Sequence, residues 1–282
     1  MSITLAGVIG AGTMGNGIAQ VFAQHSYRVM LADVSEAALE KGVSAIRTSL
    51  ARLVKKATLS EDEAAAVLAR ITPTTRLTDL APAGIVVEAA TENPAIKEAL
   101  FREISGIVAT DTILASNTSS ISLTLIASWC NHPERVIGMH FMNPVPVMQL
   151  VEIIRALQTS DATWQVVHAL AGTLSKTPVT AKDAPGFVSN RILMPMINEA
   201  VFTLHEGLAS AEDIDTVMKL GMNHPIGPLA LADLIGLDTC LAIMDILYRE
   251  FRDSKYRACP LLVQMVSAGR LGRKSGHGFY PY

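Results

Sequence analysis

The sequence predicts an α/β protein in which a doubly wound, mostly parallel sheet with an inserted helical hairpin precedes an all-α C-terminal domain. Three observations predict this fold class. A glycine-rich stretch, G-A-G-T-M-G, directly follows the first apolar run. Further short apolar runs alternate with helix-like segments as far as Val179. Beyond Gly186 the apolar residues follow only helical spacing.

The first three elements predict the opening of a Rossmann domain. Ile3–Gly10 is an apolar run that ends in glycine, which is typical of a buried parallel strand. Thr13–His25 has the pattern of a helix, and Val29–Asp33 has that of a second short strand. This strand–helix–strand order begins the doubly wound sheet.

Residues 35–69 predict a helical hairpin inserted after the second strand. Apolar side chains recur at alternating spacings of four and three residues, so one face of a helix is apolar. Ser60 and Glu63 have the spacing of a capping box at the start of a second, shorter helix. The apolar positions of the first helix are Leu39, Val43, Ile46, Leu50 and Leu53.

Five further apolar runs predict the rest of the sheet. Helix-like segments separate several of them, so most strands are expected to run parallel. A helix with Val166, Val167, Leu170 and Leu174 on its apolar face leads to the last run. The predicted strands are Ile85–Ala89, Ile113–Ser116, Val136–His140, Val151–Ile154 and a strand near Val179.

Pro185 and Gly186 mark the predicted boundary between two domains, residues 1–184 and residues 185–282. Pro195 falls inside the first helix of the second domain and is expected to bend it. The helices of this domain are expected around residues 187–206, 211–220, 228–235, 238–251 and 260–268.

Composition limits the classes of function. The 282 residues are 50% hydrophobic and have a formal net charge of −3, so we expect no broad basic surface for nucleic acid or an anionic membrane. The 3 cysteines lack CxxC spacing and the 7 histidines lack HxxxH or HExxH spacing, so we expect neither a disulfide framework nor a metal site. Without a recognisable export signal or membrane span, the chain is expected to be a soluble cytoplasmic protein.

The glycine motif predicts a dinucleotide site. Gly10 would allow a tight turn, Gly12 would let the backbone approach a diphosphate, and Gly15 would let the helix pack close to the strand. The N–H groups at the helix N-terminus would then face the phosphates. Asp33 ends the second strand, where its carboxylate would accept hydrogen bonds from ribose hydroxyls and repel a ribose phosphate. NAD is therefore favoured over NADP, and Ser35 is available to cap the next helix instead of Asp33.

His140 and Glu152 are the candidates for proton transfer. His140 ends an apolar strand and is expected at the carboxyl edge of the sheet, where ligands bind in such folds. An imidazole titrates in the range that a general base needs. Glu152 lies inside the next apolar strand, where an unpaired carboxylate is unfavourable and an imidazole partner is favoured. From these residues alone, a structural histidine is as good an interpretation as a base.

Six sequence blocks resemble the short-chain 3-hydroxyacyl-CoA dehydrogenases. The first is M-H-F-M-N-P-V-P-V-M-Q-L-V-E, which contains both His140 and Glu152. The resemblance extends over essentially the whole chain and implies a Rossmann domain followed by a helical dimerisation domain. The other blocks are V-E-A-A-T-E-N (87–93), S-N-T-S-S (116–120), D-A-P-G-F-V-S-N-R (183–191), E-D-I-D (212–215) and K-S-G-H-G-F-Y (274–280).

The resemblance implies a role for particular residues. His140 would be the general base and Glu152 its partner, orienting the ring and stabilising the imidazolium. Ser119 and Asn190 would be polar contacts to the reacting oxygen of the substrate. The implied cofactor contacts, besides the three glycines and Asp33, are Glu92, Lys97, Asn117, Asn143 and Lys274, and the implied CoA contacts are Ser49 and Lys56.

These implied roles have structural alternatives. Ser119 also fits a loop cap and Asn190 a contact at a helix N-terminus. Glu92 and Lys97 also fit charges at a helix end. The basic helical face formed by Arg47, Arg52, Lys55 and Lys56 also fits an ordinary solvated surface.

The implied activity is NAD-dependent oxidation of a (S)-3-hydroxyacyl-CoA to the 3-ketoacyl-CoA, and the reverse reduction. A short acyl chain such as 3-hydroxybutyryl-CoA is preferred, and a homodimer through the helical domain is implied. The alternatives are a 3-hydroxyadipyl-CoA dehydrogenase, a dehydrogenase of CoA-free hydroxy acids or sugar acids, and a non-catalytic nucleotide-binding structural or sensor protein.

Overall fold

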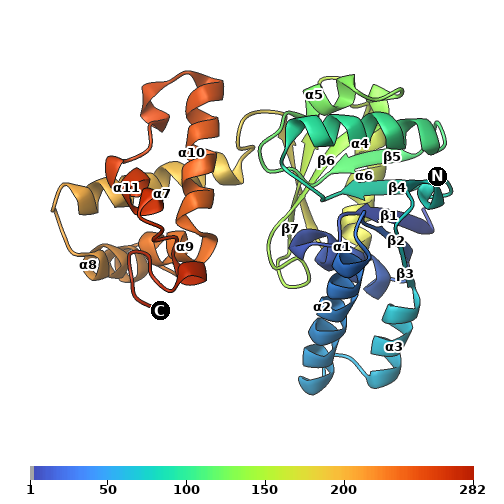
Figure 1. Cartoon of the computed structure of the whole chain (residues 1–282), viewed down its shortest axis with the longest axis horizontal. Coiled ribbons are helices and arrows are strands. Elements are labelled where there is room, and N and C mark those ends of the chain that lie inside the picture. The colour runs from blue at the N-terminus through green and yellow to red at the C-terminus, as the bar shows by residue number, and fades with distance from the viewer. Residues whose placement is uncertain (1–2) are drawn as a thin grey trace. The chain divides into compact units, whose positions relative to one another are not determined.

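A computed structural model describes residues 3–282 (Figure 1). By its internal contacts the chain divides into two compact units, one ending at Asp183 and one running from Ala184 to Tyr282. Among residues 3–282, no helix is both long enough and apolar enough to cross a lipid bilayer.

The first unit is built on one eight-stranded sheet with the order β3-β2-β1-β4-β5-β6-β7-β8. Every neighbouring pair is parallel except β6 and β7, which run antiparallel. The predicted Rossmann fold with a mostly parallel sheet is therefore confirmed. The strands are β1 (Leu5–Ile9), β2 (Arg28–Ala32), β3 (Ile71–Thr74), β4 (Ile85–Glu88), β5 (Ile113–Ser116), β6 (Val136–Phe141), β7 (Leu150–Arg155) and β8 (Thr177–Lys182).

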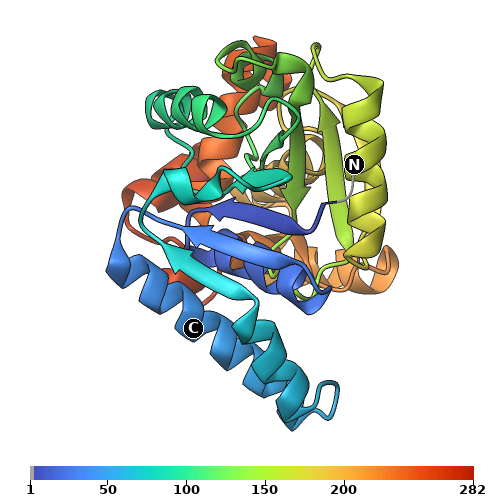
Figure 2. The same ribbon diagram turned by 90° about the vertical axis from the view of Figure 1, so that its right-hand side faces the viewer.

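The helices of this unit begin at the capping residues that the sequence offers. Ser35 accepts a hydrogen bond from Ala38 N, and Ser60 forms the predicted capping box with Glu63. The helical hairpin is therefore confirmed, and Figures 1 and 2 show its two helices extending together beyond the strands. The helices are α1 (Thr13–Gln24), α2 (Glu36–Lys55), α3 (Glu61–Ala69), α4 (Pro94–Ile107), α5 (Leu123–Ser128) and α6 (Asp161–Thr173).

The sheet separates two layers of side chains because successive residues of a strand point to opposite faces. Met139 and Phe141 of β6 join the core that packs against α1, α2 and α6. His140 lies between them and therefore faces the other side of the sheet. On that side Gly138 lies against Leu123 of α5.

Strand β3 was not predicted. Its four residues include Pro73, and Thr72 and Pro73 are exposed, so no apolar run marks it. Pro is tolerated here because β3 is an edge strand that pairs only with β2. Every strand that the sequence did predict is present, with its ends at most two residues from the predicted positions.

The second unit is helical, as predicted. Residues 184–282 contain isolated β-bridges near the C-terminus but no strand. The predicted helix 211–220 is divided, because its α-helical part ends at Thr216 and a π-helical turn follows over Val217–Gly221. Pro195 does lie inside α7. The helices are α7 (Ser189–His205), α8 (Ala211–Thr216), α9 (Pro228–Ile235), α10 (Leu237–Phe251) and α11 (Pro260–Ser267).

Two buried aspartates explain the last two sequence blocks. Asp215 of the E-D-I-D block accepts hydrogen bonds from Leu229 N at 2.8 Å and from the Tyr280 hydroxyl at 2.8 Å. Asp233 accepts from Phe279 N at 3.0 Å, and a Cβ on Gly278 would lie 1.9 Å from its carboxylate. These blocks therefore fasten the C-terminal segment to α8 and α9.

Candidate active site

The turn between β1 and α1 has the features of an anion-binding loop. Gly10 has φ +98°, and a Cβ on Gly15 would lie 1.7 Å from Gly10 O, so neither position accepts a side chain. A Cβ on Gly12 would meet no atom within 4 Å, so the backbone there is open on its outer side. Gly12 caps α1 without a side chain, and no acidic residue lies in the first turn. The N–H groups of α1 are thus suited to the diphosphate of a dinucleotide.

Asp33 lies beside this turn. Its carboxylate accepts hydrogen bonds from Ala11 N at 2.8 Å and from Ser35 N at 3.1 Å. Ser35, not Asp33, caps α2. The carboxylate is therefore held at the glycine turn, a position suited to accepting hydrogen bonds from ribose hydroxyls.

His140 and Glu152 are cross-strand neighbours. The antiparallel register of β6 and β7 pairs the two residues directly, so their side chains lie on the same face of the sheet. His140 Nδ1 lies 2.7 Å from Glu152 Oε2. His140 is 6% exposed and Glu152 1% exposed, so the pair is shielded from water and its electrostatic coupling is strong.

Ser119 lies at the other nitrogen of the imidazole. Its Oγ is 3.2 Å from His140 Nε2. Glu92 holds this loop, because its carboxylate accepts from Ser119 N at 2.7 Å and from Thr118 Oγ1 at 2.7 Å. Glu92, predicted as a cofactor contact, also holds Ser119 in place, and this hydrogen bond was not predicted.

Two asparagines flank the same strand. Asn117, 8% exposed, accepts a hydrogen bond from Phe141 N at 2.9 Å and so ties the end of β5 to β6 next to His140. Asn143 is exposed in the connection between β6 and β7. Both therefore lie near the carboxyl edge of β6, and their predicted contacts with the cofactor stay predictions.

Lys97 is buried, at 1% exposed, and forms an ion pair with Glu88. Ser116 Oγ donates to the same carboxylate at 2.9 Å. Glu88 also accepts from Ala90 N at 2.9 Å, so this cluster shapes the backbone that follows β4. We did not predict Glu88, although a carboxylate ending the apolar run I-V-V-E gives the same signal that identified Glu152.

Replacing Lys97 with Met is expected to lower the free energy of unfolding by about 3 kcal/mol, because Glu88 would remain buried without its ammonium partner. Urea denaturation measures the change. Lys41→Met, at an exposed position of α2, is the matched control and should change the free energy by less than about 0.5 kcal/mol. Equal stability of the two variants would contradict the role of the buried pair.

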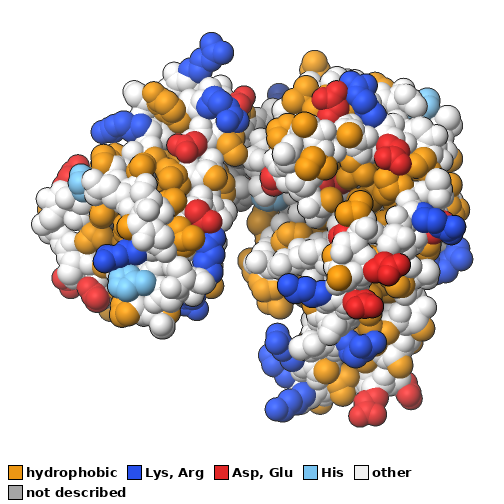
Figure 3. All heavy atoms as spheres, in the orientation of Figure 1, with side chains coloured by type: hydrophobic (Ala, Val, Ile, Leu, Met, Phe, Trp, Pro, Cys, Tyr) orange, Lys and Arg blue, Asp and Glu red, His pale blue; other side chains and the backbone are white. Residues whose placement is uncertain are grey.

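The predicted CoA contacts lie on α2. Ser49 is half-buried and Lys56 is exposed at the C-cap of the helix. Arg47, Arg52 and Lys55 are also exposed, and Figure 3 shows basic side chains along the outer end of the hairpin. The positive charge that the sequence predicts is therefore presented to solvent on this helix.

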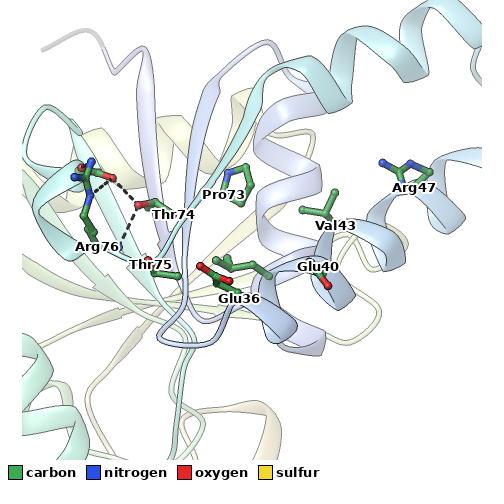
Figure 4. A pocket seen from close by; sticks show the side chains of 10 residues that line it. Glu36, Glu40, Val43, Arg47, Pro73, Thr74, Thr75 and Arg76 are labelled. Carbon is green, nitrogen blue, oxygen red and sulfur yellow. Dashed lines mark hydrogen bonds and ion pairs between the residues drawn. The ribbon is translucent and has the colours of Figure 1, made fainter.

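A groove of about 690 Å³ is lined by α2, by the end of β3 and by the segment that follows β3 (Figure 4). It is lined by charges of both signs, among them Glu36, Glu40 and Arg47, and Arg76 there is paired with Asp79. None of the predicted site residues lines this groove.

Asn190 and Lys274 belong to the second unit. Asn190 is half-buried in the first turn of α7. Lys274 forms an ion pair with Asp238 of α10. Burial alone would raise the pKa of Asp238, but the hydrogen bond from Lys274 and those from backbone N–H groups outweigh burial and lower this pKa.

The glycine turn after β1 is suited to a diphosphate, and β6 of the same sheet carries a buried imidazole that lies between a carboxylate and a hydroxyl. Together these two features define a nucleotide-dependent dehydrogenase acting on alcohols. Two family models match the chain: "3-hydroxyacyl-CoA dehydrogenase, NAD binding domain" over residues 5–184, and "3-hydroxyacyl-CoA dehydrogenase, C-terminal domain" over residues 186–282. The chain therefore belongs to the 3-hydroxyacyl-CoA dehydrogenase family. It is an oxidoreductase with NAD as its cofactor, and the resemblance seen in the sequence is confirmed.

Named relatives agree with this assignment. A probable 3-hydroxybutyryl-CoA dehydrogenase of Deinococcus radiodurans is 56% identical over 98% of this chain and 99% of its own length. The 3-hydroxybutyryl-CoA dehydrogenase of Bradyrhizobium diazoefficiens is 50% identical over 98% of this chain and 94% of its own length. The crystal structure of (S)-3-hydroxybutyryl-CoA dehydrogenase from Ralstonia eutropha matches 100% of this chain and 99% of its own with a TM-score of 0.97 and 57% identity.

Proposed function

We propose that this protein oxidises short-chain (S)-3-hydroxyacyl-CoA, and 3-hydroxybutyryl-CoA in particular, to the 3-ketoacyl-CoA, and that it catalyses the reverse reduction. The observation that carries this proposal is the placement of His140 between Glu152 and Ser119 on one face of the sheet. The names of relatives that are at least 50% identical over nearly their whole length support the choice of substrate.

His140 is the proposed general base. Its Nδ1–H donates to Glu152, which leaves Nε2 unprotonated and able to take the proton of the substrate hydroxyl. As the ring becomes an imidazolium, the buried carboxylate of Glu152 stabilises the new positive charge. A bound NAD would supply the hydride acceptor, so that the alcohol would lose its hydroxyl proton to His140 and a hydride from its β-carbon to the cofactor. In the reverse direction the imidazolium returns the proton to the ketone oxygen.

Ser119 is proposed to hold the reacting oxygen, since its hydroxyl lies beside His140 Nε2 and its backbone is fixed by Glu92. Asn190 is proposed as a second contact to this oxygen on the basis of the resemblance. The proposed cofactor contacts are Gly10, Gly12, Gly15, Asp33, Glu92, Lys97, Asn117, Asn143 and Lys274. Lys97 and Lys274 would have to act while paired with Glu88 and Asp238.

The rate of NADH formation with a panel of substrates tests the proposed activity. We expect (S)-3-hydroxybutyryl-CoA to be oxidised with NAD far better than with NADP, because Asp33 would repel the additional phosphate. The panel includes longer acyl chains, 3-hydroxyadipyl-CoA, and 3-hydroxybutyrate without CoA. A preference for the CoA-free acid would support the alternative hydroxy-acid dehydrogenase, and absence of turnover with every substrate would support a non-catalytic role.

Lys56→Glu tests recognition of CoA by α2. We expect the KM for 3-hydroxybutyryl-CoA to rise by about tenfold with little change in kcat, because an exposed charge near the phosphates would favour binding in the ground and transition states alike. Lys41→Glu, also exposed on α2, has the same change in charge and serves as the control. An unchanged KM in Lys56→Glu would show that CoA does not contact this helix end.

We further propose a cytoplasmic homodimer that assembles through the second unit. Large apolar side chains of this unit are exposed, including Leu208 at 79%, Leu220 at 82% and Met222 at 60%. Such exposed apolar area is typical of a surface that another protein chain covers.

A further inference from the structure

The connection Met142–Gln149 joins β6 to β7, so it links the strand that carries His140 to the strand that carries Glu152. It carries Asn143 near its start. Within it, Val147 N and Met148 N both donate to Pro144 O at 3.0 Å, which forms a tight local turn. The carbonyls of Val145 and Met148 are not used by this turn and need other donors.

Lys176 supplies those donors. Its side-chain Nζ donates to Val145 O at 2.6 Å and to Met148 O at 2.7 Å. Lys176 is only 9% exposed, and burial lowers the pKa of its ammonium. Lysine is seldom buried, because burial of an ammonium group is unfavourable unless its N–H donors are satisfied. Here the two backbone carbonyls satisfy two of these donors.

The position of Lys176 is itself fixed relative to the cofactor helix α1. Next to it in the chain, Ser175 Oγ lies 2.9 Å from His25 Nε2, and Thr173 Oγ1 lies 2.8 Å from the Tyr27 hydroxyl. His25 is the C-cap of α1, and Tyr27 lies between α1 and β2. The connection Met142–Gln149 also packs against α1 itself, because a Cβ on Gly17 of α1 would lie 2.9 Å from Val145 Cβ. The helix, the turn before β8 and the connection Met142–Gln149 are therefore packed as one unit.

We propose that Lys176 is a positioning residue that holds the connection Met142–Gln149 against α1, and thereby sets Asn143 and the His140–Glu152 pair in place relative to the bound cofactor. The kinetic part of this inference rests on the proposed function. Lys176 acts only through the backbone carbonyls of Val145 and Met148, so its side chain need not touch the substrate or cofactor.

Lys176→Met tests the proposal, with Lys182→Met as the matched control, because Lys182 is exposed at the end of β8 and Lys176 directly precedes this strand. Three quantities are compared in the full-length protein: amide hydrogen exchange at Val147 and Met148, NADH affinity by fluorescence, and kcat against KM for 3-hydroxybutyryl-CoA. We expect Lys176→Met to speed exchange at both amides, to weaken NADH binding, and to lower kcat roughly tenfold with KM for the acyl-CoA nearly unchanged. The control should match the wild type in all three.

Faster exchange with unchanged NADH affinity and kcat would overturn the proposal, because the connection would then be loosened without effect on the site. Unchanged exchange would overturn it as well. If Lys176→Met does not fold, Lys176→Gln replaces it, since an amide can still donate to one carbonyl and should give a smaller change in the same direction. If the wild type oxidises none of the substrates, the proposed function fails, and exchange together with NADH affinity still decides the role of Lys176.

Discussion

Replacement of His140 by Gln will lower kcat for 3-hydroxybutyryl-CoA oxidation by about 10²- to 10⁴-fold, the range that a positioned general base contributes. Glutamine has a similar length and can still hydrogen-bond to Glu152, but it cannot take a proton from the substrate hydroxyl. The affinity for NADH should stay close to that of the wild type, because the glycine turn and Asp33 are untouched.

The matched control is His132→Gln, since His132 lies in the same unit but has a side chain 44% exposed. Steady-state NADH formation and NADH fluorescence titration are measured for both variants and the wild type. His132→Gln should behave as the wild type in both assays. Turnover within a factor of about three in His140→Gln would exclude the imidazole as the base.

Replacement of Glu152 by Gln is expected to lower kcat by about 10²- to 10³-fold. The neutral amide cannot stabilise the imidazolium, and through its NH₂ group it can bind the ring in the tautomer that leaves Nε2 protonated. Because the side chain is 1% exposed, no solvent charge can replace the lost carboxylate. The KM for the acyl-CoA should change little, since Glu152 is not expected to contact the substrate.

The double variant His140→Gln/Glu152→Gln separates this role from a structural one. If Glu152 acts through His140, the double variant should be about as slow as His140→Gln alone, because the effects of residues that act as a unit are not additive. Glu98→Gln removes an exposed partner of Arg102 and should leave kcat unchanged. Multiplied losses in the double variant would indicate that Glu152 acts independently of the imidazole.

The local parts of the site could be predicted from the sequence. The glycine turn follows from residues within a few positions of one another, and its backbone demands are met only by glycine at Gly10 and Gly15. The contact between His140 and Glu152 was foreseeable, because a carboxylate within an apolar strand needs a partner. The direction of β7 was not predicted, although the connection 142–149 is too short for the crossover that parallel neighbouring strands need.

Contacts between segments far apart in the chain could not be predicted from the sequence. Glu92 binds the backbone N–H of Ser119 across 27 positions, and Lys176 reaches Val145 across 31. These residues appear in sequence as ordinary surface charges, and only the packing of the chain selects their partners. Strand β3 was missed for a related reason, because an exposed edge strand with a proline has no apolar pattern.

A crystal structure of the wild-type protein with NAD and acetoacetyl-CoA bound, two oxidised ligands that cannot react with each other, shows which side chain lies at the reacting oxygen. The ketone oxygen should lie about 3 Å from Nε2 of His140, with Nδ1 still hydrogen-bonded to Glu152. A ketone oxygen that is hydrogen-bonded only to other side chains, with the imidazole turned away from it, would contradict the role of His140 as the general base.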